Sequence, residues 1–356
     1  MDYSRLITTT SQSVAPFVVD AIHGSSVLVG RVTGGTNMKP WDMGIYERQP
    51  IQVSDISTAI DFQGIGNFNT ADNSTDVNLQ WEAKGLGDSV IIGYAELGLN
   101  QTKAQVINLV KRKFDVVKNS LIAAAGTRLY GLGAGSAIEG LQLSTDAGTY
   151  SSSYGALSRT TYGTAINGQV TPASAGVVSF NALAAQIDLC SAAASSLEAT
   201  NLILTTKSVW ALIEKLVESK SRGNYDTSRG NLRVSPYTPM GVAVDASDAG
   251  RAGYEAIYFR GIPTVKDDQT PTGLIYTLNE NHLQFVTSQV AYCENIKMGQ
   301  TVTKGALEEV NSTAWQVSKE AKPTNGLGDV RQIIAYGNFV NRDPVRSGVI
   351  TGVTTT

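Results

Sequence analysis

TKAQVINLVKRKFDVVKNSLIAAAGTR, residues 102–128, is the stretch that decides the fold. Its apolar residues recur at steps of three or four, which is the spacing of one face of an α-helix: Val106, Val110, Phe114, Val117 and Leu121. Thr102 and Gln105 form a capping-box signature at its start, and the glycines of YGLGAGS (130–136) stop it. The sequence therefore predicts a helix of roughly 40 Å, at about 1.5 Å per residue, which is long enough to span a domain.

The polar side of this helix carries a run of cations, Lys111, Arg112 and Lys113, with Lys118 further along. A single-stranded nucleic-acid site would interleave aromatic residues with its cations, for stacking on the bases, and this run does not. We interpret it as a solvent-facing helix surface.

Residues 45–98, before the helix, alternate apolar and polar residues with period two. Ile51, Val53, Ile60 and Phe62 form one limb, Val77, Leu79 and Trp81 the other, and NFNTADNST (67–75) separates them. The pattern predicts a long β-hairpin. Because an isolated hairpin is only marginally stable in water, this one needs another surface, belonging either to its own domain or to a neighbouring subunit.

Residues 1–44 contain TTTSQS (8–13) and a Gly- and Ser-rich stretch, and we expect an irregular arm without a core of its own. After the long helix, residues 135–178 are rich in Gly, Ser, Thr and Tyr and predict a mixture of strand and loop. Residues 179–290 predict a compact α/β unit, and 291–356 predict strands that return to the region of the long helix. The helices and strands expected in 179–290 are a helix from 179 to about 190, a strand at 202–204, a helix at 207–217, and strands at 256–259, 262–265, 274–278 and 283–286.

The composition limits the function classes. A chain of 356 residues exceeds the roughly 250–300 at which one core stops growing, so two compact regions are expected. Charged residues make up only 17% of the chain and the net charge is −3, which excludes a strong positive field for gathering nucleic acid. Two cysteines cannot build a disulfide framework, the N-terminus lacks the features of a secretory signal, and no apolar run is long enough for a bilayer. We expect a protein that works in a cytoplasm.

The sequence contains few residues and motifs that are typical of a catalytic site. There are two histidines, and the sequence lacks the spacings of a serine nucleophile elbow, a P-loop and a dinucleotide-binding loop. Asp267 and Asp268, which precede a Pro-containing turn, predict a solvated turn rather than an ion site. We therefore expect no enzyme activity, no catalytic residues, no metal and no cofactor.

The order of arm, long hairpin, long helix, α/β unit and returning strands resembles the major capsid proteins of tailed bacteriophages, the Hong Kong 97 type. Local motifs strengthen this resemblance over about nine tenths of the chain. They are Gly140-Leu141 with YGALSR (154–159), LILTTKSVWALIEKLV (202–217), FRGIP (259–263), PTG (271–273), YTLN (276–279) and FVNRDP (339–344).

The resemblance implies an α+β Hong Kong 97-type capsid fold with five parts. They are an N-terminal arm (1–44), an extended β-hairpin loop (45–98), a peripheral domain with the spine helix (99–178), an axial domain (179–290) and strands returning to the peripheral domain (291–356).

It also implies a structural role: copies assemble as pentamers and hexamers into an icosahedral shell that encloses double-stranded DNA without binding it specifically. The protein would be found in the virion, and in the host cytoplasm during assembly. Expected partners are further copies of the chain and separate scaffolding and portal proteins. Decoration proteins stay an open alternative, and no membrane is expected. The candidate subunit-interface residues are Ile60, Phe62, Val77, Trp81 and Arg159.

Some relatives crosslink subunits through a Lys–Asn isopeptide bond. Lys84, Asn338 and Asn341 are the residues that such a bond could use here, and we do not expect one. Two other functions stay open: a nanocompartment shell of the same fold that encloses cargo enzymes, and an α+β enzyme of unknown class. The contents of the shell separate the first from a phage capsid, and saturable turnover would reveal the second.

Overall fold

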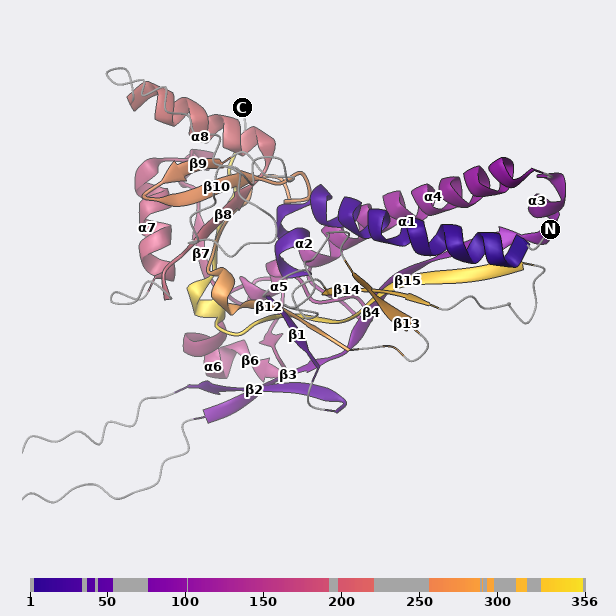
Figure 1. Ribbon diagram of the computed structural model, residues 1–356. Coiled ribbons are helices and arrows are strands. Elements are labelled where there is room, and N and C mark those ends of the chain that lie inside the picture. Colours follow the sequence, from indigo (N-terminus) through magenta and orange to yellow (C-terminus); the bar gives the residue numbers. More distant parts are fainter. Residues whose placement is uncertain are drawn as a thin grey trace, which may run out of the picture.

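The structure is a computed structural model that describes residues 3–33, 37–41, 44–53, 76–100, 102–191, 198–220, 256–288, 290, 293–297, 312–318 and 328–354. Figure 1 shows three parts: an elongated arm in which helices lie on a sheet, a lobe with a second sheet and two helices, and a two-stranded hairpin that projects below them. Within the described residues, no helix is long and apolar enough to cross a membrane.

The arm is built on helix α4 (Lys103–Leu129), which confirms the helix predicted over 102–128. Thr102 Oγ1 accepts a hydrogen bond from the backbone N–H of Gln105, and the Gln105 side chain accepts one from the N–H of Thr102. The predicted apolar face is buried. After the helix, Gly133 adopts a φ of +69°, and a Cβ there would lie 2.5 Å from Cα of Glu139, so this loop requires glycine.

The irregular conformation predicted for 1–44 is wrong over most of that range. Helix α1 (Tyr3–Ser25) packs along α4 and is followed by the short helix α2 (Val27–Val32). The hydroxyls that suggested a loop donate to carbonyl oxygens one turn back, as Ser11 Oγ does to Ile7, and so do not compete with the helix. The buried apolar residues of α1 follow helical spacing: Ile7, Ala15, Val18, Val19 and Ile22.

The first sheet lies under the arm helices. Its long strand β15 (Gly328–Asn341) pairs with β4 (Lys84–Gly93) over ten residue pairs, from Gly328↔Gly93 to Gly337↔Lys84. The strand order is β1 (Met38–Pro40), β12 (Leu283–Thr287), β15, β14 (Ser312–Ser318), β13 (Cys293–Lys297), with β4 also on β15. Aromatic side chains from these strands fill the core beneath α4: Phe285, Trp315 and Phe339.

The second sheet forms the lobe. Its strand order is β7 (Gln169–Pro172), β16 (Gly348–Thr351), β11 (Ile275–Leu278), β8 (Leu202–Thr205), β10 (Ile262–Lys266), β9 (Ala256–Phe259). Helices α7 (Phe180–Cys190) and α8 (Lys207–Lys220) pack with it (Figure 1). Side chains of β8 alternate: Leu202 and Leu204 join the core shared with the arm, and Ile203 faces the helices. The helices and strands predicted between 179 and 286 are thus confirmed. The prediction that 179–290 forms one α/β unit is wrong in part, because β12 lies in the first sheet and the second sheet includes β7 and β16 from outside this range.

The hairpin consists of β2 (Tyr46–Gln52) and β3 (Asp76–Glu82), paired antiparallel from Tyr46↔Glu82 to Gln52↔Asp76. The two predicted limbs therefore pair as expected over these residues. Residues 54–75, which include Ile60 and Phe62, lie outside the described residues. The short helix α3 (Tyr94–Leu99) connects β4 with α4 at the tip of the arm (Figure 1). The other short elements lie between α4 and β7 in the chain: α5 (Leu141–Ser144), β5 (Ser153–Tyr154), β6 (Leu157–Ser158) and α6 (Arg159–Ile166).

Candidate assembly site

The root of the hairpin is anchored in its own chain by Trp81. This side chain is 1% exposed, and its ring meets the edge of the Tyr154 ring with 6.0 Å between centroids. Leu79, on the same face of β3, packs against the backbone at Gly155, where a Cβ would lie 2.6 Å from Leu79 Cδ2. The hairpin therefore leaves the molecule from a rigid, buried base.

This anchoring corrects one predicted interface residue. Trp81 was predicted to contact another subunit, but its ring is buried within its own chain, in the cluster beneath β3, and is not presented to another copy. Val77 is half-buried opposite Ile51, nearer the free end of the hairpin, and stays a candidate.

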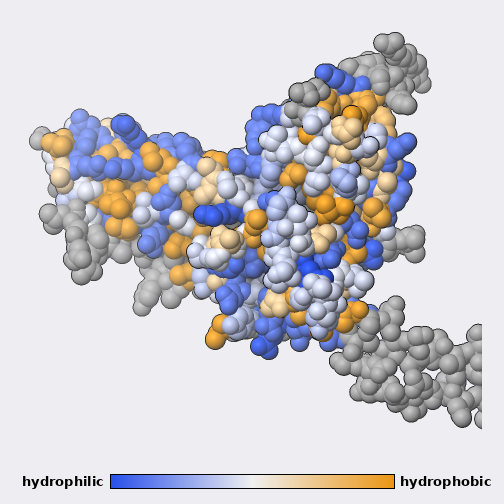
Figure 2. All heavy atoms as spheres, turned by 180° about the vertical axis from the view of Figure 1, so that it is seen from behind, coloured by the Kyte–Doolittle hydropathy of each residue, from blue (hydrophilic) through white to orange (hydrophobic). Residues whose placement is uncertain are grey.

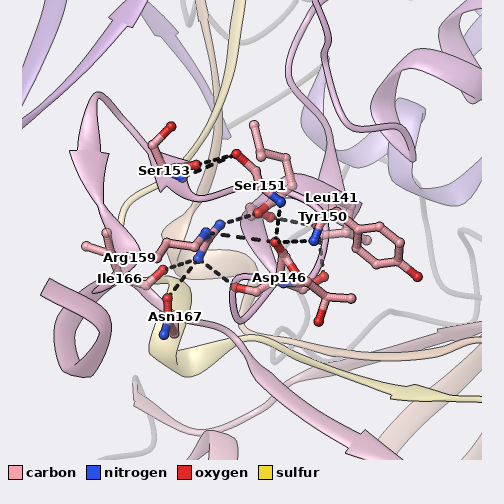
Figure 3. A network of polar contacts seen from close by, with 12 residues as sticks. Leu141, Asp146, Tyr150, Ser151, Ser153, Arg159, Ile166 and Asn167 are labelled. Atoms are coloured by element: carbon pink, nitrogen blue, oxygen red, sulfur yellow. Dashed lines mark hydrogen bonds and ion pairs between the residues drawn. The ribbon is translucent and has the colours of Figure 1, made fainter. Parts of the chain in front are cut away.

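Arg159 is the centre of a buried polar network (Figure 3). The side chain is 2% exposed, at the start of α6. Its guanidinium donates to four oxygens: the carbonyl oxygens of Leu143 (2.6 Å), Asp146 (2.6 Å) and Ile166 (2.8 Å), and the side-chain oxygen of Asn167 (3.2 Å). The planar guanidinium of Arg159, which lies at the start of α6, thus connects α5 and the residues after it with the end of α6.

The charge of Arg159 is balanced by Asp146, whose Oδ2 lies 4.0 Å from Arg159 Nε. The carboxylate also accepts hydrogen bonds from the backbone N–H groups of Thr149, Tyr150 and Ser151. Burial lowers the pKa of Arg159, and Asp146 opposes that shift. The prediction of Arg159 as a surface charge for another subunit is therefore wrong: its partners lie in its own chain, which sequence spacing alone did not reveal.

The prediction of a solvated turn is wrong for Asp267. Instead of lying in a solvated turn, it is 2% exposed, and its Oδ2 accepts hydrogen bonds from Ser26 Oγ (2.7 Å), the N–H of Leu28 (3.3 Å) and Tyr130 Oη (2.9 Å). One carboxylate thus joins the start of α2, the end of α4 and the second sheet. Burial, together with the charge of Asp267, raises the pKa of Tyr130, which keeps its hydroxyl a donor. Its neighbour Asp268 is exposed, as predicted.

Lys84 and Asn338, considered for a crosslink, lie near each other in one chain. Lys84 Nζ is 3.5 Å from Oε1 of Glu139, a carboxylate whose pKa is raised by burial and lowered in part by Lys84. Asn338 is fully buried, and its side-chain oxygen accepts from the backbone N–H groups of Glu139 and Phe339. Asn341 is also fully buried. Neither asparagine is presented to a neighbouring subunit.

One cluster has the donor atoms of a metal site. Glu198, His282 and Asp343 offer ligand atoms within 4.8 Å of one another, the one such group in the described part of the chain. However, Nε of Arg346 lies 3.3 Å from Glu198 and 3.6 Å from Asp343. A guanidinium already compensates the two carboxylates from between them, so the arrangement fits an ion-pair network better than a cation site.

Several large apolar side chains remain at the surface of the arm. Phe17 on α1 is 70% exposed, Leu99 at the end of α3 84%, and Val116 on α4 63%. Single exposed apolar side chains are ordinary on a protein surface, and only a large contiguous patch indicates a surface that another molecule covers.

The comparison with solved structures identifies the architecture. No family model and no curated protein sequence matches the chain. Among solved structures, the capsid of cyanophage A-1(L) matches with a TM-score of 0.59 and 13% identity, over 90% of this chain and 92% of the capsid chain. The capsid of a native GTA particle matches with a TM-score of 0.50 and 11% identity, over 92% and 91%. The SrpI encapsulin from Synechococcus elongatus PCC 7942 gives 0.48 and 10%, over 90% and 86%. The chain has the Hong Kong 97-type capsid fold, with the mixed helix and sheet content expected.

Proposed function

We propose that this chain is the major capsid protein of a tailed bacteriophage, a structural subunit whose copies form pentamers and hexamers of an icosahedral shell around double-stranded DNA. The observation that carries the proposal is the likeness to the cyanophage capsid chain over nine tenths of both chains.

In this proposal the part with α4 and the first sheet is the peripheral domain, and the lobe with the second sheet is the axial domain. The ranges predicted for them, 99–178 with 291–356 and 179–290, are corrected at three strands: β7 and β16 belong to the lobe sheet, and β12 to the first sheet. Residues 45–98 are the extended loop. Residues 1–44, which contain helices α1 and α2, take the place of the N-terminal arm. Ile60, Phe62 and Val77 are the hairpin residues that contact other subunits. Separate scaffolding, portal and decoration proteins are the expected partners, the virion is the expected location, and no step of the role requires catalysis.

The test is expression of the chain with and without the neighbouring phage genes, followed by electron microscopy and analysis of the particle contents. Closed shells that protect double-stranded DNA from nuclease are the expected result. Shells that hold an enzyme and no DNA would identify a nanocompartment instead. A chain that stays monomeric under all these conditions would refute a shell-forming role.

A further inference from the structure

A pocket of about 110 Å³ lies between the lobe sheet and α5 with the residues that follow α5. Unlike the hydrophobic patches that lie among hydrophilic residues on the surface in Figure 2, it has walls on two sides. One wall is a row across three adjacent strands, because Val170 of β7 pairs with Val349 of β16, and Val349 with Tyr276 of β11. Leu274 and Thr351, each two residues from a member of this row, extend it. This wall is apolar apart from the hydroxyls of Tyr276 and Thr351.

The opposite wall consists of α5 and the residues after it, among them Gln142, Thr145 and Tyr150. Its distance from the sheet is fixed at Gly168, which directly precedes β7. The backbone N–H of Gly168 donates to the carbonyl oxygen of Asp146 at 3.1 Å, and a Cβ on Gly168 would lie 2.3 Å from the carbonyl oxygen of Thr145. Backbone contacts therefore set the width of the pocket.

Asp146 is the one charged residue among those that line the pocket, and its charge is already compensated. Its carboxylate oxygens accept the backbone N–H groups of Thr149, Tyr150 and Ser151, and Arg159 Nε lies 4.0 Å from Oδ2. A charged ligand would lose its hydration without gaining a counter-charge, which is unfavourable. The pocket thus fits an uncharged ligand.

Tyr276 brings a polar group without a partner to this pocket. Its side chain is 0% exposed, and among the described residues its hydroxyl has no hydrogen-bond partner. Burial raises the pKa of Tyr276, with a smaller contribution from Tyr150 on the opposite wall, so the hydroxyl stays protonated and can donate. Because a buried polar group is costly to leave unpaired, the Tyr276 hydroxyl indicates that a hydrogen-bonding group occupies the pocket.

The other lining groups favour a ligand with an apolar body over water alone. Val170, Leu274 and Val349 offer no polar side-chain atom, and the hydroxyl of Thr145 already donates to the carbonyl oxygen of Leu141 at 2.9 Å. A buried water makes about three hydrogen bonds, so waters against the aliphatic wall would lack partners. By comparison with a cavity that binds benzene, a pocket of this size holds roughly four to six non-hydrogen atoms.

We propose that this pocket binds a small uncharged amphiphile, an alcohol with a short aliphatic chain. Its hydroxyl pairs with Tyr276, and its chain packs on Val170, Leu274 and Val349. Because the ligand contacts both the lobe sheet and the residues around α5, its binding stabilises the folded chain by mass action. The inference does not depend on the shell-forming function, since every residue of the pocket belongs to one chain.

Saturation-transfer NMR of the full chain with butanol tests the inference, and saturable binding in the millimolar range is expected. Tyr276→Phe removes only the hydroxyl and should weaken butanol binding about tenfold, while binding of chlorobutane, which lacks the hydroxyl, is unchanged. The matched control is Tyr258→Phe, because Tyr258 lies on β9 of the same sheet and is 44% exposed. This control should bind butanol as the unmodified chain does. Absence of saturable binding, or equal affinity in Tyr276→Phe, overturns the inference.

A variant that fills the pocket is an independent test. Val170→Phe places a ring against the pocket on an edge strand, where Val170 is 37% exposed, and should abolish butanol binding. Circular dichroism verifies that the variant is folded. Retained binding contradicts the inference, because the ligand would then lie elsewhere. Glycerol binding as tight as that of butanol also contradicts it, because the aliphatic wall has no partners for several hydroxyls. Neither result bears on shell assembly, which is measured separately.

Discussion

The Arg31 guanidinium and the Glu280 carboxylate form a buried, bidentate ion pair. Arg31 Nη2 lies 2.8 Å from Glu280 Oε2, Nε donates to Oε1, and the two side chains are 3% and 4% exposed. Arg31 belongs to α2, and Glu280 begins the turn (Glu280–His282) between a strand of each sheet, β11 and β12. The pair therefore fixes the N-terminal helices at the junction of the arm and the lobe.

Breaking this pair on one side should be costly. Arg31→Met leaves the Glu280 carboxylate buried without its partner, and we expect the free energy of unfolding to fall by about 3–5 kcal/mol. Arg31→Met/Glu280→Leu removes both charges and should recover much of that loss. Urea unfolding of the unassembled chain measures both. A double variant as unstable as the sum of the singles would contradict the account.

Asp267 and Asp268 offer a comparison between adjacent residues of the same type. Asp267→Asn weakens the acceptor for Ser26, Leu28 and Tyr130, and should cost about 1–3 kcal/mol of unfolding free energy. Asp268→Asn affects only an exposed pair with Lys207 and should cost less than about 1 kcal/mol. Thermal unfolding of the two variants checks the difference, and equal losses would show that the buried carboxylate has no special role.

Trp81 and Val77, both on β3, allow a similar comparison between a buried and a half-buried residue. Trp81→Ala removes a buried ring from the cluster beneath β3, and we expect a loss of about 3–5 kcal/mol. Val77→Ala, at a half-buried position, should reduce the stability of the isolated chain by much less and act on assembly instead. Measuring unfolding and shell yield for both variants separates the two roles. A stable, well-folded Trp81→Ala chain would remove the evidence for a rigid base.

Stability should decrease in mild acid because of His23. Burial lowers the pKa of this fully buried imidazole from 6.5 to about 4. Between these values the unfolded chain binds a proton that the folded chain does not, so the folded state loses stability as the pH falls through this window. The expected loss is about 3 kcal/mol at pH 4.

The variant His23→Gln has no group that titrates at this position. The difference in stability between it and the unmodified chain should therefore shift in its favour as the pH falls from about 6.5 to about 4. Urea unfolding over this range supplies the data, and a pH-independent difference would contradict the assignment.

The sequence determined the secondary structure where local signals agree. For α4, the apolar spacing, the Thr102 cap and the glycines after Leu129 all indicate the same ends, because each acts within a few residues of the helix. Helix α1 was missed because its Ser and Thr residues suggest loops, whereas packing on α4 supplies the free energy that favours the helix.

The tertiary structure alone decided which polar and aromatic residues are buried. Arg159, Asp267 and Trp81 lie in segments whose local patterns are compatible with a surface, and their partners come from other elements of the chain. Sequence periodicity gives the face of an element on which a residue lies. What covers that face depends on how distant segments of the chain pack together, and no local pattern encodes that contact.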